Sequence, residues 1–135
     1  MVSKSKRRVI DAAAVAGMAL LLGGHALTAR QDPATASAPR VIEVVASQFA
    51  FDPATIEVTE GERIRLMVHS ADRVHGFEIK KLRINKPIPR GGKPVQIDFV
   101  APAAGRYEIL CSEDCGEGHK DMTGTLVVQA KPGGR

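Results

Sequence analysis

From Val41 onward, apolar and polar residues alternate along the chain with a period of two, and no stretch has the repeat of an amphipathic helix. The clearest case is residues 62–69, where Ile64, Leu66 and Val68 fall on one face and arginines on the other. Such a segment predicts a strand with one buried face. Further strands are predicted at 41–47, 55–59, 77–80, 82–85, 93–100, 106–110 and 123–129.

Turn residues separate these segments. Asp52-Pro53 and Glu60-Gly61 interrupt the alternation, and the Pro- and Gly-rich stretch 87–92 predicts a loop. Seven or eight short strands within about 90 residues, without crossover helices, predict an all-β fold, namely an antiparallel Greek-key β-sandwich. We expect this domain at residues 41–130, after a flexible tether at 30–40 and before a disordered tail at 131–135.

The first 29 residues have a different character. Four basic residues within positions 4–8 precede an apolar run at 9–29, whose uninterrupted core is 12–22. One N-terminal hydrophobic helix is predicted, and it serves either as a membrane anchor or as a cleaved signal peptide. In both cases the basic cluster stays in the cytoplasm and the rest of the chain is exported.

Charge excludes one class of function. The net charge is +4, but residues 1–30 hold five basic residues and one acid (5 − 1 = +4), so residues 31–135 are neutral with 14 of each sign. A nucleic-acid-binding domain carries its basic excess on its folded surface. We therefore expect no nucleic-acid partner.

The candidate chemistry lies in residues 111–122, between two predicted strands. Four side chains of this stretch bind metals, namely Cys111, Cys115, His119 and Met122. Thiolate, imidazole and thioether together suit copper, because soft sulfur favours Cu(I) and imidazole accepts both oxidation states. A further histidine upstream, either His75 or His69, can complete the set, and Gly76 favours His75 because it lets the backbone approach the site.

The pattern Cys-Ser-Glu-x-Cys-Gly-x-x-His-x-x-Met in this stretch resembles the loop of the dinuclear copper centre CuA, which cytochrome c oxidase subunit II carries on a cupredoxin fold. Val-His-Gly-Phe at residues 74–77 resembles the subunits II that have a single membrane anchor. The resemblance implies two copper ions bridged by Cys111 and Cys115. It also implies that His75 and Met122 complete one copper, and that His119 and the main-chain carbonyl of Glu113 complete the other.

The same resemblance implies a one-electron relay with no bond chemistry at the site. The donor would be a soluble cytochrome c or a small copper protein, and the acceptor a haem-containing oxidase subunit I. Oxidase activity would then belong to the complex, with this domain on the periplasmic side of the membrane. The alternative is a stand-alone exported cupredoxin that carries electrons or copper.

Two other interpretations of the cysteines remain open. A Cys/Cys/His/His set can hold structural zinc, although the C-x3-C-x3-H spacing is not that of a zinc finger and a thioether is a poor zinc ligand. Two cysteines in an exported chain can also form a disulfide, which would block metal loading.

Overall fold

The computed structural model describes residues 37–133. The predicted anchor or signal peptide, most of the predicted tether and the last two residues of the predicted tail lie outside the described residues. Within residues 37–133 there is no helix with the length and apolar character needed to cross a membrane.

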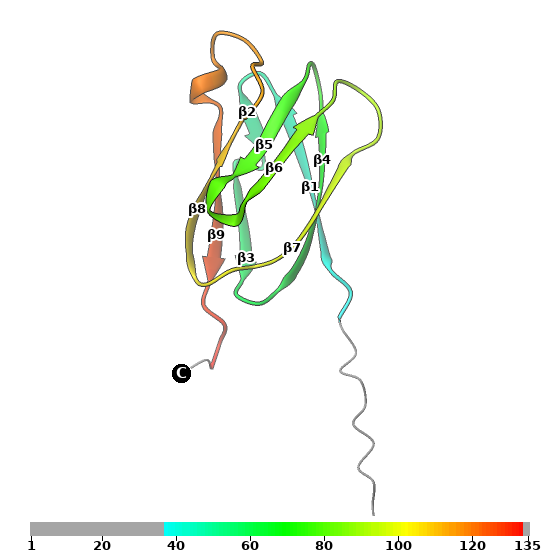
Figure 1. Cartoon of the computed structure of the whole chain (residues 1–135). Helices are drawn as coiled ribbons and strands as arrows, with labels where there is room; N and C mark the ends of the chain where they lie inside the picture. Colours follow the sequence, from blue (N-terminus) through cyan, green and yellow to red (C-terminus); the bar gives the residue numbers. More distant parts are fainter. Residues whose placement is uncertain (1–36, 134–135) are drawn as a thin grey trace, which may run out of the picture. The chain divides into compact units, whose positions relative to one another are not determined.

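Strands dominate the described part of the chain (Figure 1), as the alternation predicts. The nine strands are β1 (Arg40–Ser47), β2 (Ala50–Asp52), β3 (Thr55–Thr59), β4 (Arg63–Ser70), β5 (His75–Ile79), β6 (Ile84–Ile88), β7 (Val95–Val100), β8 (Gly105–Leu110) and β9 (Thr123–Gln129). Two single 3-10 turns, η1 (Lys80–Leu82) and η2 (His119–Asp121), are the helical elements of this part.

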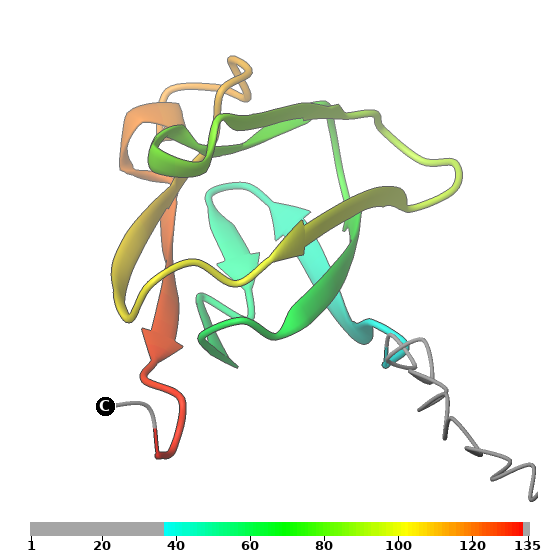
Figure 2. The ribbon, with the colours of Figure 1, turned by 60° about the horizontal axis from the view of Figure 1, so that its bottom comes forward.

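The strands form two sheets, with orders β2-β1-β4-β7 and β3-β9-β8-β5-β6. Figure 2 shows them closing around one interior. The predicted antiparallel pairing is wrong at two places, since β1 runs parallel to β4 and β3 runs parallel to β9. The chain crosses from one sheet to the other after β2 and returns after β3, so β4 re-enters the first sheet in the direction of β1.

The core is built by the buried faces of both sheets. In β4 the predicted inward residues Ile64, Leu66 and Val68 are fully buried, which confirms the assignment of that face. Phe51 of β2 packs edge to face against Phe77 of β5, with ring centroids 5.6 Å apart. Aliphatic side chains fill most of the remaining interior.

The β5–β6 hairpin differs from the prediction in its limits. β5 begins at His75, two residues before the predicted strand, and β6 continues through Pro87, where a loop was predicted. Proline lacks an N–H and is excluded from the middle of a sheet. Here it is tolerated because β6 is the outermost strand of its sheet.

The segment 111–122 closes one pole of the sandwich, at the top of Figure 1. β8 leads directly into it and β9 leaves it, with Leu110 paired to Thr123. The N–H of Cys111 donates to the carbonyl of Met122 at 3.2 Å, which joins the two ends of the segment 111–122. The turns that join β1 to β2 and β4 to β5 lie at the same pole.

Candidate metal centre

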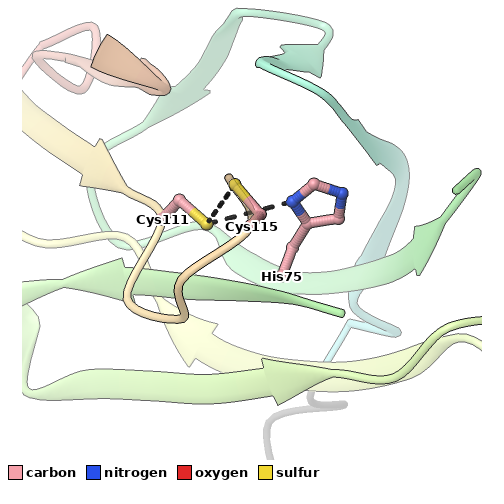
Figure 3. A group of neighbouring side chains, drawn as sticks. All are labelled: His75, Cys111 and Cys115. Atoms are coloured by element: carbon pink, nitrogen blue, oxygen red, sulfur yellow. Dashed lines mark hydrogen bonds between the residues drawn. The ribbon is translucent and has the colours of Figure 1, made fainter. Parts of the chain in front are cut away.

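The two cysteines lie side by side inside this pole. Their Sγ atoms are 3.6 Å apart, and both are free thiols rather than a disulfide. Cys115 is fully buried and Cys111 is 7% exposed. Figure 3 shows both sulfurs and the ring of His75 pointing toward one another. These three residues place one ligand atom each within 4.8 Å of the others.

His75 opens β5 and is fully buried. Its Nδ1 lies 3.9 Å from Cys111 Sγ, and its Nε2 lies 2.7 Å from a carboxylate oxygen of Asp72. Since an ionised carboxylate only accepts, Nε2 carries the proton and Nδ1 presents its lone pair to the sulfurs. Asp72 therefore fixes both the orientation and the tautomer of His75.

The carboxylate of Asp72 is itself held in place. It accepts hydrogen bonds from the backbone N–H groups of Gln48 and Arg73, both at 2.7 Å. Partial burial acts to raise the pKa of Asp72, but the hydrogen bonds from His75 and these two amides outweigh it and lower the pKa. Asp72 is thus kept as an anion beside the buried imidazole.

His119 and Met122 approach the other sulfur. His119 Nδ1 is 3.9 Å and Met122 Sδ is 3.7 Å from Cys115 Sγ. The 3-10 turn η2 sets this spacing, because the N–H of Met122 bonds the carbonyl of His119 at 3.2 Å. His119 remains half-buried, whereas Met122 is fully buried.

Glu113 contributes its main chain and not its side chain. Its carboxylate is exposed, while its carbonyl oxygen accepts a hydrogen bond from the Cys111 thiol at 3.2 Å. The six predicted residues thus lie close together at this pole, Glu113 through its carbonyl oxygen beside Cys111.

Gly76 allows the two parts of the cluster to meet. Its N–H points at Cys111 Sγ at 3.4 Å. A Cβ at this position would lie 2.0 Å from Ser112 Oγ and 2.6 and 2.7 Å from the backbone nitrogens of Ser112 and Glu113. The expectation that Gly76 permits close backbone approach is confirmed.

Burial in the pole raises the pKa of the Cys115 thiol from its ordinary 9.0 to about 11, and the neighbouring Cys111 thiol adds to the effect. The metal-free Cys115 thiol is therefore protonated at neutral pH. A bound cation reverses this preference, because metal ligation requires the thiolate and releases its proton.

The donor set fits copper. Two thiols, a thioether and two imidazole nitrogens form a soft, buried cluster of the kind that copper prefers over hard cations. The 3.6 Å between the sulfurs is less than twice a metal–thiolate bond of about 2.3 Å, the value for zinc, so one ion can contact both sulfurs.

The alternative histidine, His69, lies elsewhere. It occupies the outer face of β4, paired with Val45, and its Nδ1 is buried without a hydrogen-bond partner among the described residues. In that part of the chain His69 makes no hydrogen bond to the cysteines, whereas His75 is in contact with Cys111. Geometry thus favours His75.

Three residues around the cluster were not predicted from the sequence. Asp72 holds His75, while Gln48 and Arg73 both donate to the carbonyl oxygen of Cys115. Asp72 stands three residues before His75, and that short spacing is the single signal that could have pointed to it.

Comparisons with known proteins agree with this geometry. A family model described as a cupredoxin-like domain matches residues 13–128. A cytochrome c oxidase subunit 2 of Thermus thermophilus is 37% identical over 89 residues, which is 65% of this chain and 64% of that protein. A second T. thermophilus subunit 2 has the same identity, and the match covers 52% of its length. The chain thus spans between half and two thirds of these relatives.

Solved structures show the same fold. A haem–copper terminal oxidase dimer contains a chain that matches with a TM-score of 0.61 at 25% identity, covering 70% of this chain and 68% of that one. The periplasmic domain of subunit II of the Bradyrhizobium japonicum cytochrome oxidase matches with a TM-score of 0.61 at 20% identity, covering 67% of this chain and 84% of that one. With its sandwich, its cysteine-bearing loop and a family match over most of its length, the chain belongs to the cupredoxin-like domain family.

Proposed function

We propose that this domain is a dinuclear copper electron-transfer module of the CuA type. The observation that supports this best is the paired arrangement at the pole. Two free, buried sulfurs lie 3.6 Å apart, and each has the Nδ1 of a different histidine at 3.9 Å. A mononuclear site has no use for a second cysteine with its own histidine. Met122 and the carbonyl of Glu113 are the two remaining ligands of the proposed centre.

The proposed ligands are His75, Cys111, Glu113 (through its carbonyl), Cys115, His119 and Met122. Copper held by them supplies one-electron redox chemistry. The chain supplies a fixed cluster: β5 carries His75, β8 and β9 hold the two ends of the loop that carries the other ligands, and burial of Cys115, Met122 and His75 keeps water away from the sulfurs. A framework that already places these groups together needs little rearrangement when the charge of the site changes.

We further propose that the domain serves as subunit II of a terminal oxidase. It would take single electrons from a soluble cytochrome c or small copper protein and pass them to a haem-containing subunit I. The similarity to T. thermophilus oxidase subunits supports this role. The relative from B. japonicum is a periplasmic domain, and we propose the same side of the membrane here, whether the chain is anchored or released.

Electron paramagnetic resonance of the copper-loaded full-length chain tests the site. One electron shared by two copper nuclei gives seven hyperfine lines, and metal analysis should find two copper ions per chain. Cys115→Ser should reduce this to at most one copper with four lines, while Ser112→Ala, in the same loop but without a proposed ligand, should keep seven. Four lines in the unaltered chain, or zinc in place of copper, would refute the proposal.

Purification in mild detergent from the native source tests the partner. Recovery together with a haem-containing subunit is expected. Recovery as an isolated copper-loaded chain would instead favour the stand-alone electron or copper carrier and leave the copper site itself intact.

A further inference from the structure

Side chains from two different turns donate hydrogen bonds to the carbonyl oxygen of Cys115. It accepts a hydrogen bond from Gln48 Nε2 at 2.7 Å and another from a guanidinium nitrogen of Arg73 at 3.2 Å. Gln48 belongs to the β1–β2 turn and Arg73 to the β4–β5 turn, while Cys115 is central to the loop 111–122. The backbone beside the more buried sulfur is thus held by two side chains from outside its own loop.

Arg73 brings a positive charge to this point. Arginine stays protonated under all ordinary conditions. In the part of the chain that the structure describes, Arg73 forms no ion pair, since the arginine–carboxylate pairs there are Arg40–Glu62 and Arg65–Asp98. Its guanidinium is therefore free to act on the Cys115 carbonyl.

The loop itself carries the opposite charge. Residues 111–122 contain Glu113, Asp114, Glu117 and Asp121 against a single lysine, Lys120. The acid next to Cys115, Asp114, has its carboxylate within 3.0 Å of the N–H of Gly116. Negative charge near a redox site disfavours the arrival of an electron, and a nearby positive charge favours it. Arg73, whose guanidinium lies 3.2 Å from the carbonyl oxygen of Cys115, is placed to offset the charge of these exposed acids at the site.

We propose that Arg73 is a positioning residue of the metal centre, which holds the Cys115 backbone in place through its carbonyl and raises the reduction potential of the site by its charge. This inference rests on the proposed copper function. It adds a residue outside the proposed ligand set, since Arg73 lies in the β4–β5 turn and its side chain hydrogen-bonds the carbonyl oxygen of Cys115.

The test is the reduction potential of the copper-loaded full-length chain, measured on an electrode so that no protein donor is needed. Arg73→Gln removes the charge and keeps a hydrogen-bond donor, whereas Arg73→Lys keeps the charge. Gln48→Leu removes the shorter hydrogen bond without a change of charge. Arg106→Gln is the distant control, because it lies five residues from Cys111 along β8, about 16 Å at about 3.3 Å per residue.

Arg73→Gln should lower the equilibrium constant for one-electron reduction about threefold to tenfold, where tenfold corresponds to a shift of about 59 mV. Arg73→Lys should restore most of this difference, and Arg106→Gln should change nothing beyond error, because it lies further away than the screening length of about 8 Å at physiological salt. Gln48→Leu should shift the potential less than Arg73→Gln.

A potential for Arg73→Gln equal to that of the unaltered chain, or equal to that of Arg73→Lys, would overturn the inference. If Arg73→Gln fails to take up copper while Arg73→Lys and Arg106→Gln load fully, the positioning role is supported directly. An unaltered chain without two redox-active coppers would instead refute the proposed function, so the two failures are distinguishable.

Discussion

The two histidines of the cluster are held in opposite ways. His75 comes from a sheet strand, is fully buried, and has its second nitrogen fixed by Asp72. His119 sits on the single turn η2, is half-buried, and has local backbone hydrogen bonds as its support. One half of the site is thus part of the framework, and the other is part of a loop that rests on it.

This difference indicates how the site is assembled. The half of the site that contains His75 forms as soon as the sandwich folds, because His75, Gly76 and Phe77 are all buried in β5. The loop half depends on contacts that the loop makes with its surroundings, namely those at Gly76, Gln48 and Arg73. Changes on the framework side should therefore disturb more of the molecule than changes in the loop.

The largest effect is expected from Gly76→Ala. The new Cβ would overlap the backbone nitrogens of Ser112 and Glu113, which cannot move aside as a flexible side chain can. We expect a loss of stability of about 3 kcal/mol and loss of copper binding. Thermal unfolding and metal analysis measure both.

Gly91→Ala is the matched control for this change. Gly91 has a φ of 66°, and no atom lies within 4 Å of an added Cβ. Alanine there should cost about 1 kcal/mol of stability, because of its backbone conformation and without any steric clash. Equal losses at both glycines would show that the contact between β5 and the loop is unimportant.

A smaller effect is expected from Asp72→Ala, which removes the carboxylate that orients His75. Loss of such a partner lowers metal affinity about 10- to 100-fold. Asp72→Asn should retain part of the affinity, since an amide oxygen can still accept from Nε2. Competition with a copper chelator measures the change.

Asp121→Ala is the control on the other half of the site, because it alters an exposed acid of η2 beside His119. Its affinity should equal that of the unaltered chain. A loss as large as that of Asp72→Ala would mean that both histidines depend equally on nearby carboxylates, which would contradict the comparison.

The smallest effect is a pH dependence in the loop half. The pKa of the Cys115 thiol is raised in the folded, metal-free chain to about 11, so the unfolded chain loses this proton first as pH rises. The contribution to stability is fully present below the ordinary value of 9.0 and is lost as pH rises toward about 11. Melting temperatures of the metal-free chain between pH 7 and 11 should therefore fall.

Cys115→Ser serves as the reference in this series, because a serine hydroxyl does not titrate in that range. The difference between the two chains isolates the thiol from the lysines and the tyrosine that also titrate there. Two parallel curves would show that the thiol is not protected by the fold.

The strands and their buried faces could be predicted from the sequence, because period-two alternation reports which side of a strand is covered. The direction of pairing could not be predicted. A strand with one buried face alternates in the same way beside a parallel neighbour as beside an antiparallel one. The sequence therefore does not indicate that β1 pairs with β4, and β3 with β9, in the parallel direction.

More of the metal-binding cluster could be predicted from the sequence than of the residues that hold it in place. Cysteine, histidine and methionine at fixed spacing in one loop show their chemistry in the sequence, and Gly76 marks the upstream histidine. Gln48 and Arg73 act on a backbone carbonyl 67 and 42 residues away, and any polar residue in a turn looks the same until the turns are brought together.

Pro87 in β6 also bears on how these molecules behave at high concentration. An outermost strand with a full row of N–H groups is a template onto which another chain can add, and stacks of such chains precipitate. Here that row is interrupted at Pro87, and the charged Lys86 stands beside it. An incoming strand therefore finds no continuous row of N–H groups along this edge of the sheet, which disfavours edge-to-edge association of two such domains through β6.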